Sequence, residues 1–380
     1  GVPHYLDRLL HVPFKVGVNW GAALFESVHD VKLDDFGGVE GAKAVVQFAI
    51  ARQRVERSFI MPGGASVGEL ERKGSIFLVG GGLVTIHLPF VVLKKLNLLL
   101  GLHGNAILDD NLLFFPSPVR PWRWQDFEEL HAHVQAVRIN ALLAAQEAEI
   151  RAAENKVQDT ERRALLLDKE EDGTALLGEL DAANKKVARL KAERKAGFRL
   201  RDVIPGALAA EEILSLRVLL KPLQCVHENE RFLVQKTDLS AVVEEVECRE
   251  GNLGFDGGIF LAAKNNALFD GRFACPTAIE KKHIVIFWQD KHSELDTKSD
   301  TVSAGDISAW YSEASDATTP WRTAGHTVVL LYVTNRRLTG ILAVGKLCAL
   351  AVVAREQLRA YLSSTFAGRG LIAAAAKSAD

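Results

Sequence analysis

Cysteine is scarce in this sequence of 380 residues, which contains only four, and none of them forms a C-x-x-C pair or stands near histidines at zinc-finger spacing. This argues against a disulfide framework or a structural zinc site and favours buried thiols in a reducing compartment. An excess of either charge sign is also lacking, because 46 Lys and Arg residues nearly balance 48 Asp and Glu residues, for a formal net charge of −2. Such a balance argues against a protein whose whole surface attracts nucleic acid, but it does not exclude a local basic cleft.

Long apolar runs are missing as well. The longest stretches, around Leu88–Leu93 and Leu347–Ala354, are shorter than about 20 residues or are broken by Lys and Gly, so no membrane span is expected. No G-x-x-x-x-G-K-[ST] motif occurs, which excludes an intact P-loop. The chain opens without Met and without a charged-then-apolar leader, as expected of an internal fragment.

The remaining pattern predicts an α/β protein with three parts. Residues 1–125 predict a mixed module, with a helix at Gly41–Arg54, a β-hairpin around Gly80-Gly81-Gly82 and a short helix near Leu93 to Leu100. Residues 126–197 predict an antiparallel coiled-coil hairpin, because narrow apolar stripes on two charged helices flank a charged break that contains glycine.

Residues 198–380 predict an α/β domain. Apolar, β-branched runs predict buried strands at 284–288 and Thr327–Thr334. Periodic apolar positions predict helices at Ala207–Leu220, Ile307–Glu313 and Leu347–Leu362.

The central strand ends abruptly in Gln289-Asp290-Lys291. Because side chains alternate along a strand, Gln289 and Lys291 are expected on one face and Asp290 on the other. Asp270 precedes the strand at a predicted turn, and Mg²⁺ or Mn²⁺ prefers oxygen ligands such as carboxylates and amide carbonyls. Asp270 and Gln289 are therefore predicted to hold a metal ion, with Lys291 stabilising charge that develops on a phosphate.

Further acids and other readings stay open. Glu211 and Glu212 are candidates for an additional carboxylate from the preceding helix, and Asp256 rivals Asp270, although Asp in a glycine-rich turn commonly makes only local hydrogen bonds. The plain structural alternative is that Gln289-Asp290-Lys291 merely ends a buried strand in polar residues, as many strands do. Ser66 lies in a G-x-S-x-G motif without visible upstream sheet, which favours an ordinary loop. His131 and His133, two apart on a helix, cannot share a face as a metal pair.

The residues of this region resemble the restriction-endonuclease-like domain of the Crinkler and retrotransposon-hot-spot families. The resemblance is carried by Phe269-Asp270-Gly271, Phe287–Ser293, Trp310 and Val328–Asn335. Upstream, similar segments link that family's P-loop ATPase to its nuclease, and here they are Leu88–Leu93 with Asn97, Trp124–Glu128 and Val203–Ala207.

The resemblance implies a PD-(D/E)xK-type nuclease that cuts DNA with Mg²⁺ or Mn²⁺, with Asp270 as the acid and Gln289 and Lys291 as the (D/E/Q)-x-K pair. It implies that residues 1–125 are the remnant C-terminal part of an ATPase whose P-loop part is missing. It also implies an intracellular protein, nuclear rather than cytoplasmic, or an effector secreted into a host cell.

One departure keeps an alternative open. Gln289 stands where the family has an acidic ligand, which leaves the site one negative charge short and weakens the attraction for Mg²⁺. A catalytically inactive nuclease fold that binds nucleic acid, or that binds a protein partner through its helical hairpin, is therefore the second expectation. The hairpin at 126–197 is also expected to support self-association.

Overall fold

The computed structural model describes residues 31–108, 113, 124–166, 173–222, 224–226, 258–261, 268–279, 282–291, 300–342, 349–362 and 366. Helices and mixed sheets make up these residues, in agreement with the predicted α/β class. The candidate Asp256 and the charged break at 168–172 lie outside the described residues. Across the described parts, no helix is long and apolar enough to cross a membrane.

A small antiparallel sheet organises the N-terminal module. Its strand order is β1-β3-β2, with β1 at Arg54–Glu56, β2 at Phe77–Gly80 and β3 at Leu83–His87. The elements packed around this sheet are η1 (Leu33–Phe36), α3 (Gly38–Ala51), α4 (Val67–Arg72) and α5 (Phe90–Gly101). The predicted hairpin and both predicted helices are confirmed.

Ser66 has a local structural role. Its hydroxyl accepts the backbone N–H of Glu69 at 3.2 Å, and the Glu69 carboxylate accepts the N–H of Ser66 at 2.7 Å. This reciprocal pair is a capping box that begins α4. The G-x-S-x-G motif therefore starts a six-residue helix after an isolated bridge, as the loop interpretation expected.

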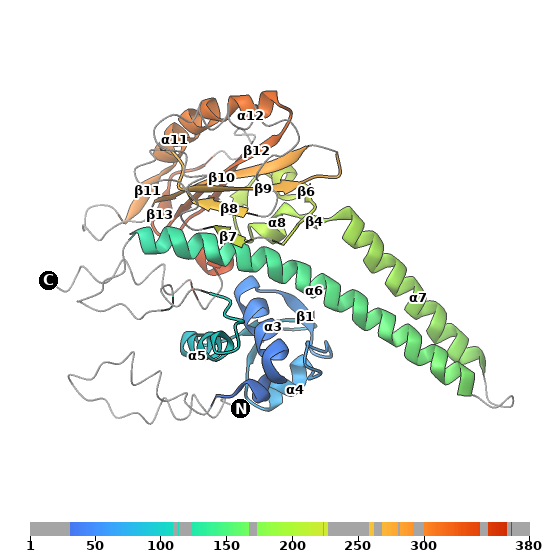
Figure 1. The fold of residues 1–380 in the computed structure, drawn as a ribbon. Helices are drawn as coiled ribbons and strands as arrows, with labels where there is room; N and C mark the ends of the chain where they lie inside the picture. The colour runs from blue at the N-terminus through green and yellow to red at the C-terminus, as the bar shows by residue number, and fades with distance from the viewer. Residues whose placement is uncertain are drawn as a thin grey trace, which may run out of the picture.

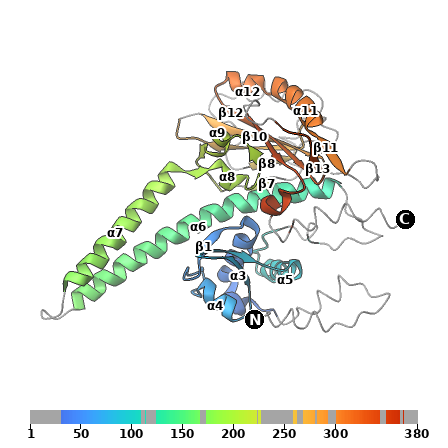
Figure 2. The ribbon, with the colours of Figure 1, turned by 180° about the vertical axis from the view of Figure 1, so that it is seen from behind.

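Two long helices form the hairpin seen projecting from the body of the molecule in Figure 1. Helix α6 spans Trp124–Leu166 and α7 spans Gly173–Ala196. Their pairing is antiparallel, as the ion pairs Arg163–Glu179 and Arg194–Glu147 at opposite ends demonstrate. The first part of α6 is not free coiled coil, however, because it is buried between the N-terminal module and the large sheet (Figure 2).

A seven-stranded mixed sheet forms the C-terminal part, with strand order β5-β14-β12-β10-β9-β8-β7. The strands are β5 (Leu208–Ala209), β7 (Gln224–Val226), β8 (Gly258–Leu261), β9 (Gly271–Pro276), β10 (His283–Lys291), β12 (Thr327–Thr334) and β14 (Leu350–Val353). Smaller pairings join β4 (Phe198–Arg199) to β6 (Arg217–Val218) and β11 (Thr301–Ser303) to β13 (Arg337–Thr339).

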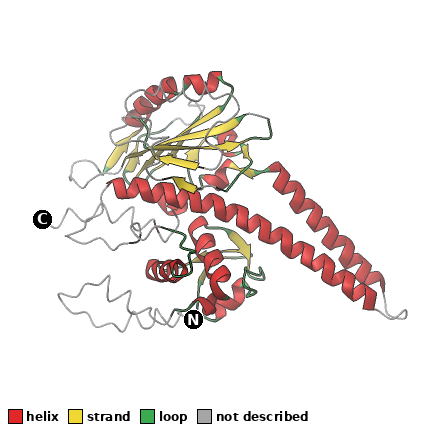
Figure 3. Ribbon diagram, viewed as in Figure 1, coloured by secondary structure: helices red, strands yellow, loops and turns green. Residues whose placement is uncertain are grey.

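Strand β10 lies at the centre and is covered on both faces (Figure 3). Helices α11 (Ala304–Ala317) and α12 (Thr319–Thr323) cover one face, where Val285 and Phe287 are buried. Helix α6 covers the other, where Ile286 and Trp288 are buried in a core shared with the N-terminal module. Burial on both faces explains why the sequence of β10 is a continuous apolar run rather than an alternating one.

Two predicted helices of the C-terminal part are wrong. Ala207–Leu220 contains β5, the one-turn helix α9 (Glu211–Leu214) and β6. Leu347–Leu362 contains strand β14, whose residues are all buried, followed by a short helical segment at 358–362. Periodicity alone cannot tell whether a short apolar run forms a buried helix or a buried strand. Here the run forms a strand because it pairs with β12 and β5.

Candidate active site

The end of β10 carries the predicted residues, and Asp270 lies beside it. The backbone N–H of Asp270, just before β9, donates to the carbonyl of Trp288 at 2.9 Å. Its carboxylate oxygen Oδ2 accepts the Gln289 Nε2 amide at 2.5 Å and the Asp290 backbone N–H at 2.6 Å. The structure thus brings Asp270 and Gln289 into direct contact, as predicted from the sequence.

The additional carboxylate of the site comes from α6. A side-chain hydrogen bond joins Glu128 to Asp270, and Lys291 is close enough to both acids to influence their ionisation. Glu211, the first residue of α9, instead accepts hydrogen bonds from Arg201 and Ser215, and Glu212 is its exposed neighbour. Helix α9 follows β5 at the far edge of the sheet, which is separated from β10 by β14 and β12.

Burial changes the acidity of both carboxyls. Desolvation, followed by the negative charge of Asp290, raises the pKa of Asp270 to about 7. Desolvation, followed by the charges of Asp270 and Asp290, raises the pKa of Glu128 to about 9. Two hydrogen-bonded carboxyls with raised pKa values hold at least one proton between them at neutral pH, because ionising both would place two negative charges side by side at a high cost in free energy.

The amide of Gln289 is only half satisfied. Its side chain is buried, with 2% of the residue exposed, and its nitrogen donates to Asp270. Its carbonyl oxygen Oε1 is buried without a hydrogen-bond partner. A buried acceptor left unpaired costs free energy, so its presence is a sign that something electropositive belongs there.

These donors suit a hard divalent cation. Mg²⁺ is commonly bound by one or two carboxylates together with water and substrate phosphate, and Asp270, Glu128 and the orphaned Gln289 oxygen provide that set. The set contains two acids rather than three. In the part of the chain that the structure describes, no group of three or more His, Cys, Asp or Glu side chains is arranged to hold a metal ion.

Exposure differs among the site residues in a useful way. Gln289 is buried, Asp270 and Glu128 are partly exposed, and Lys291 is exposed. Gln289 and Lys291 leave the strand on one face, while Asp290 turns toward α6 and contacts His131. The alternation predicted from the pleat is confirmed, and the ammonium of Lys291 is open to solvent at the strand end.

Helical spacing is the signal that could have revealed Glu128. Glu128, His131, Gln135 and Arg138 recur at intervals of three and four residues along α6, so they share one side of the helix. All but Glu128 are fully buried. A polar stripe within an otherwise apolar helical segment indicates that the helix faces polar partners rather than solvent.

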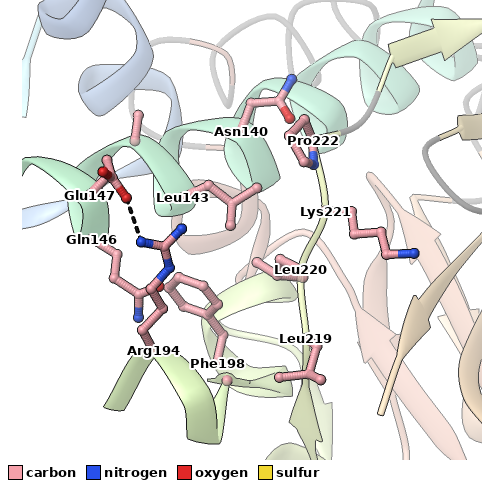
Figure 4. A pocket seen from close by; sticks show the side chains of 12 residues that line it. Asn140, Leu143, Gln146, Glu147, Arg194, Phe198, Leu219, Leu220, Lys221 and Pro222 are labelled. Carbon is pink, nitrogen blue, oxygen red and sulfur yellow. Dashed lines mark hydrogen bonds and ion pairs between the residues drawn. The ribbon is translucent and has the colours of Figure 1, made fainter. Parts of the chain in front are cut away.

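A separate cavity of about 480 Å³ lies where the hairpin meets the C-terminal part (Figure 4). Leu143, Phe198 and Leu220 line it, and the ion pair between Arg194 and Glu147, 2.7 Å long, closes one side. None of the residues of the β10 site borders this cavity.

Comparison of the chain with protein-family models, with curated proteins and with solved structures gave no match.

Proposed function

We propose that this protein hydrolyses phosphodiester bonds in DNA with a divalent cation, Mg²⁺ or Mn²⁺, held at the end of β10. The observation that carries the proposal is that the Asp270 carboxyl contacts both Glu128 and the Gln289 amide, whose carbonyl oxygen is unpaired, with the Lys291 charge near both acids. DNA as the substrate follows from the resemblance to the Crinkler and retrotransposon-hot-spot families, and a nuclear or host-cell location belongs to the same proposal.

Each residue has a defined task in this scheme. Asp270, Glu128 and Gln289 would hold the cation, which would supply polarisation of a phosphoryl oxygen and easier ionisation of water. Lys291 stabilises the negative charge that develops on the phosphate. Gln289 Nε2 and the Asp290 N–H keep the Asp270 carboxylate oriented throughout.

Cleavage of supercoiled plasmid with Mg²⁺ or Mn²⁺ tests the proposal. Lys291→Ala is expected to lower the cleavage rate at least about a hundredfold, because it removes the cation that stabilises the transition state. Lys282→Ala is the matched control, since Lys282 precedes the other end of β10 and bonds the Ala324 carbonyl at 2.8 Å. It is expected to cut like the wild type.

Two results would count against this function. Equal cutting by Lys291→Ala would remove Lys291 from the mechanism. No cutting by the wild type at high protein concentration with either metal would favour the alternative, a nuclease-like fold that binds nucleic acid or a protein partner without cleaving.

A further inference from the structure

A buried polar chain lies on the α6 side of β10, directly behind the candidate site. His131 Nδ1 lies 2.9 Å from Asp290 Oδ1 and 3.1 Å from Oδ2, and both side chains are 1% exposed. Trp288 Nε1 donates to the same carboxylate at 3.1 Å. A carboxylate only accepts when ionised, so Nδ1 of His131 is the donor in this contact.

The far side of the histidine ring is held just as firmly. His131 Nε2 lies 2.6 Å from the Tyr361 hydroxyl, which also lies 3.4 Å from Gln135 Oε1. Arg138 bonds the Tyr361 carbonyl and, at 2.5 Å, the Gln135 side chain. With both ring nitrogens engaged and no exposure to solvent, the orientation of His131 is fixed by α6 and the segment at 358–362.

The chain reaches the site through the backbone of Asp290. Pairing of β10 with β9 ends at Trp288, opposite Gly271, whereas pairing with β12 continues to Lys291. Beyond Trp288 the N–H of Asp290 has no β9 carbonyl and donates to the Asp270 side chain instead, at 2.6 Å. The backbone at Asp290 is held by β12 on one side, and its side chain is anchored by His131 and Trp288, so both supports set the position of this N–H.

We propose that His131 is a positioning residue that holds the Asp270 carboxylate in place through Asp290. Glu128 lies one helical turn before His131, so a single rigid helix presents one carboxyl of the pair and anchors the other. The effect on cleavage rests on the proposed nuclease function. The effect on the orientation of Asp270 does not.

Two substitutions at His131 separate positioning from stability. The side-chain nitrogen of Asn reaches about as far as Nδ1 of His, and that of Gln about as far as Nε2. His131→Asn therefore keeps a donor for Asp290 and loses the bond to Tyr361, and His131→Gln does the reverse. His131→Gln removes the donor to both oxygens of the buried Asp290 carboxylate, whereas His131→Asn removes only the contact with the neutral Tyr361 hydroxyl, which keeps Gln135 as a partner. His131→Gln is therefore expected to lose more stability, and cleavage is compared at a temperature at which both variants are folded.

Cleavage is expected to distinguish them. His131→Gln should lower kcat about 10- to 100-fold with little change in KM, as is usual when the support of a ligand is lost. His131→Asn should keep the kcat of the wild type, although its melting temperature is lower. Equal cutting by both variants, or equal loss in both, would overturn the positioning role.

A metal-free measurement keeps this test independent of catalysis. The Asp290 amide resonance can be followed in protein labelled with ¹⁵N-aspartate and assigned by its disappearance in Asp290→Asn. Its proton is expected far downfield in the wild type and His131→Asn, and shifted upfield in His131→Gln. An unchanged resonance in His131→Gln would overturn the inference even if the wild type cuts DNA. A wild-type protein that does not cut DNA would contradict only the proposed nuclease function.

Trp288→Phe covers the case in which His131→Gln does not fold. It removes the second donor to Asp290 and keeps an aromatic ring in the core. A smaller upfield shift of the Asp290 amide supports the anchoring of Asp290 by its side chain, and no shift contradicts it.

Discussion

The two halves of α6 carry the same kinds of polar side chain and use them in opposite ways. In the first half, His131 and Arg138 are buried and Glu128 is partly buried, with partners on the large sheet and its neighbouring segments. In the second half, Glu147 and Glu154 are partly exposed and form ion pairs with exposed basic residues of α7. One helix therefore contains both a polar element of the core and a solvated hairpin.

The difference shows that residue type alone does not predict how much a charged side chain contributes to stability. A buried polar group without its partner costs the full desolvation free energy, so partners in the first half are tightly constrained. An exposed ion pair is screened by water and usually contributes less than about 1 kcal/mol. Charged residues in the first half are thus expected to control stability and the site, and those in the second half are expected to be replaceable.

Arg138 provides the largest expected effect. Its guanidinium is fully buried and bonds Gln135 and the carbonyls of Val203 and Tyr361. Arg138→Ala leaves the Tyr361 carbonyl without its side-chain donor, takes one donor from the Val203 carbonyl and from Gln135, and opens a cavity, so the free energy of unfolding should fall by about 3 to 5 kcal/mol. Denaturant titration measures it, with the exposed Arg151→Ala as the control that should change little. A similar small change in both would contradict the contrast between the halves.

Glu128 gives an intermediate effect that depends on pH. Folding raises its pKa from 4.5 to about 9, so the folded protein keeps a proton that the unfolded chain releases. The free energy of unfolding of the metal-free protein should therefore fall as pH rises from about 5 toward 9. Glu128→Gln removes the Glu128 part of this fall, while the raised pKa of Asp270 keeps the part below about pH 7, and the variant should be more stable than the wild type at pH 9, by an amount of order 1 kcal/mol.

Melting curves at several pH values check this, and Glu129→Gln is the control because Glu129 is the exposed neighbour. If Glu128→Gln shows the same pH dependence as the wild type, the acid pair does not hold the proton inferred for it.

The hairpin should show the smallest effect. Glu154 and Lys191 lie 2.7 Å apart at the surface, with 39% and 58% of their side chains exposed. Glu154→Gln should change the free energy of unfolding by less than about 0.5 kcal/mol and leave plasmid cleavage as it is. A loss of cleavage in this variant would mean that the hairpin takes part in the reaction, and the comparison would then fail.

Local patterns predicted the strands of the site well. The run from 284 to 288 and Thr327–Thr334 became β10 and β12, and alternation placed Gln289 and Asp290 on opposite faces. These features depend on neighbouring residues alone, which is why the sequence contains enough information for them.

Features that depend on tertiary packing were not predictable in the same way. Glu128 reaches Asp270 only because α6 packs against the sheet, and the intervening chain contains the whole hairpin. Glu211 and Glu212 are the acids of the predicted helix that precedes the strand, but that helix is only the single turn α9, at the sheet edge. The apolar run of β14 predicts a helix as readily as a strand, because only pairing with β12 and β5 distinguishes the two.

Calorimetric titration with Mn²⁺ at neutral pH tests the site most directly. We expect one ion to bind per chain with release of a proton, because Asp270 and Glu128 must lose their shared proton to act as ligands. Asp270→Asn should abolish this binding, and Glu129→Gln should retain it. No binding to the wild type at millimolar Mn²⁺, or binding unchanged in Asp270→Asn, would contradict a metal site at the end of β10.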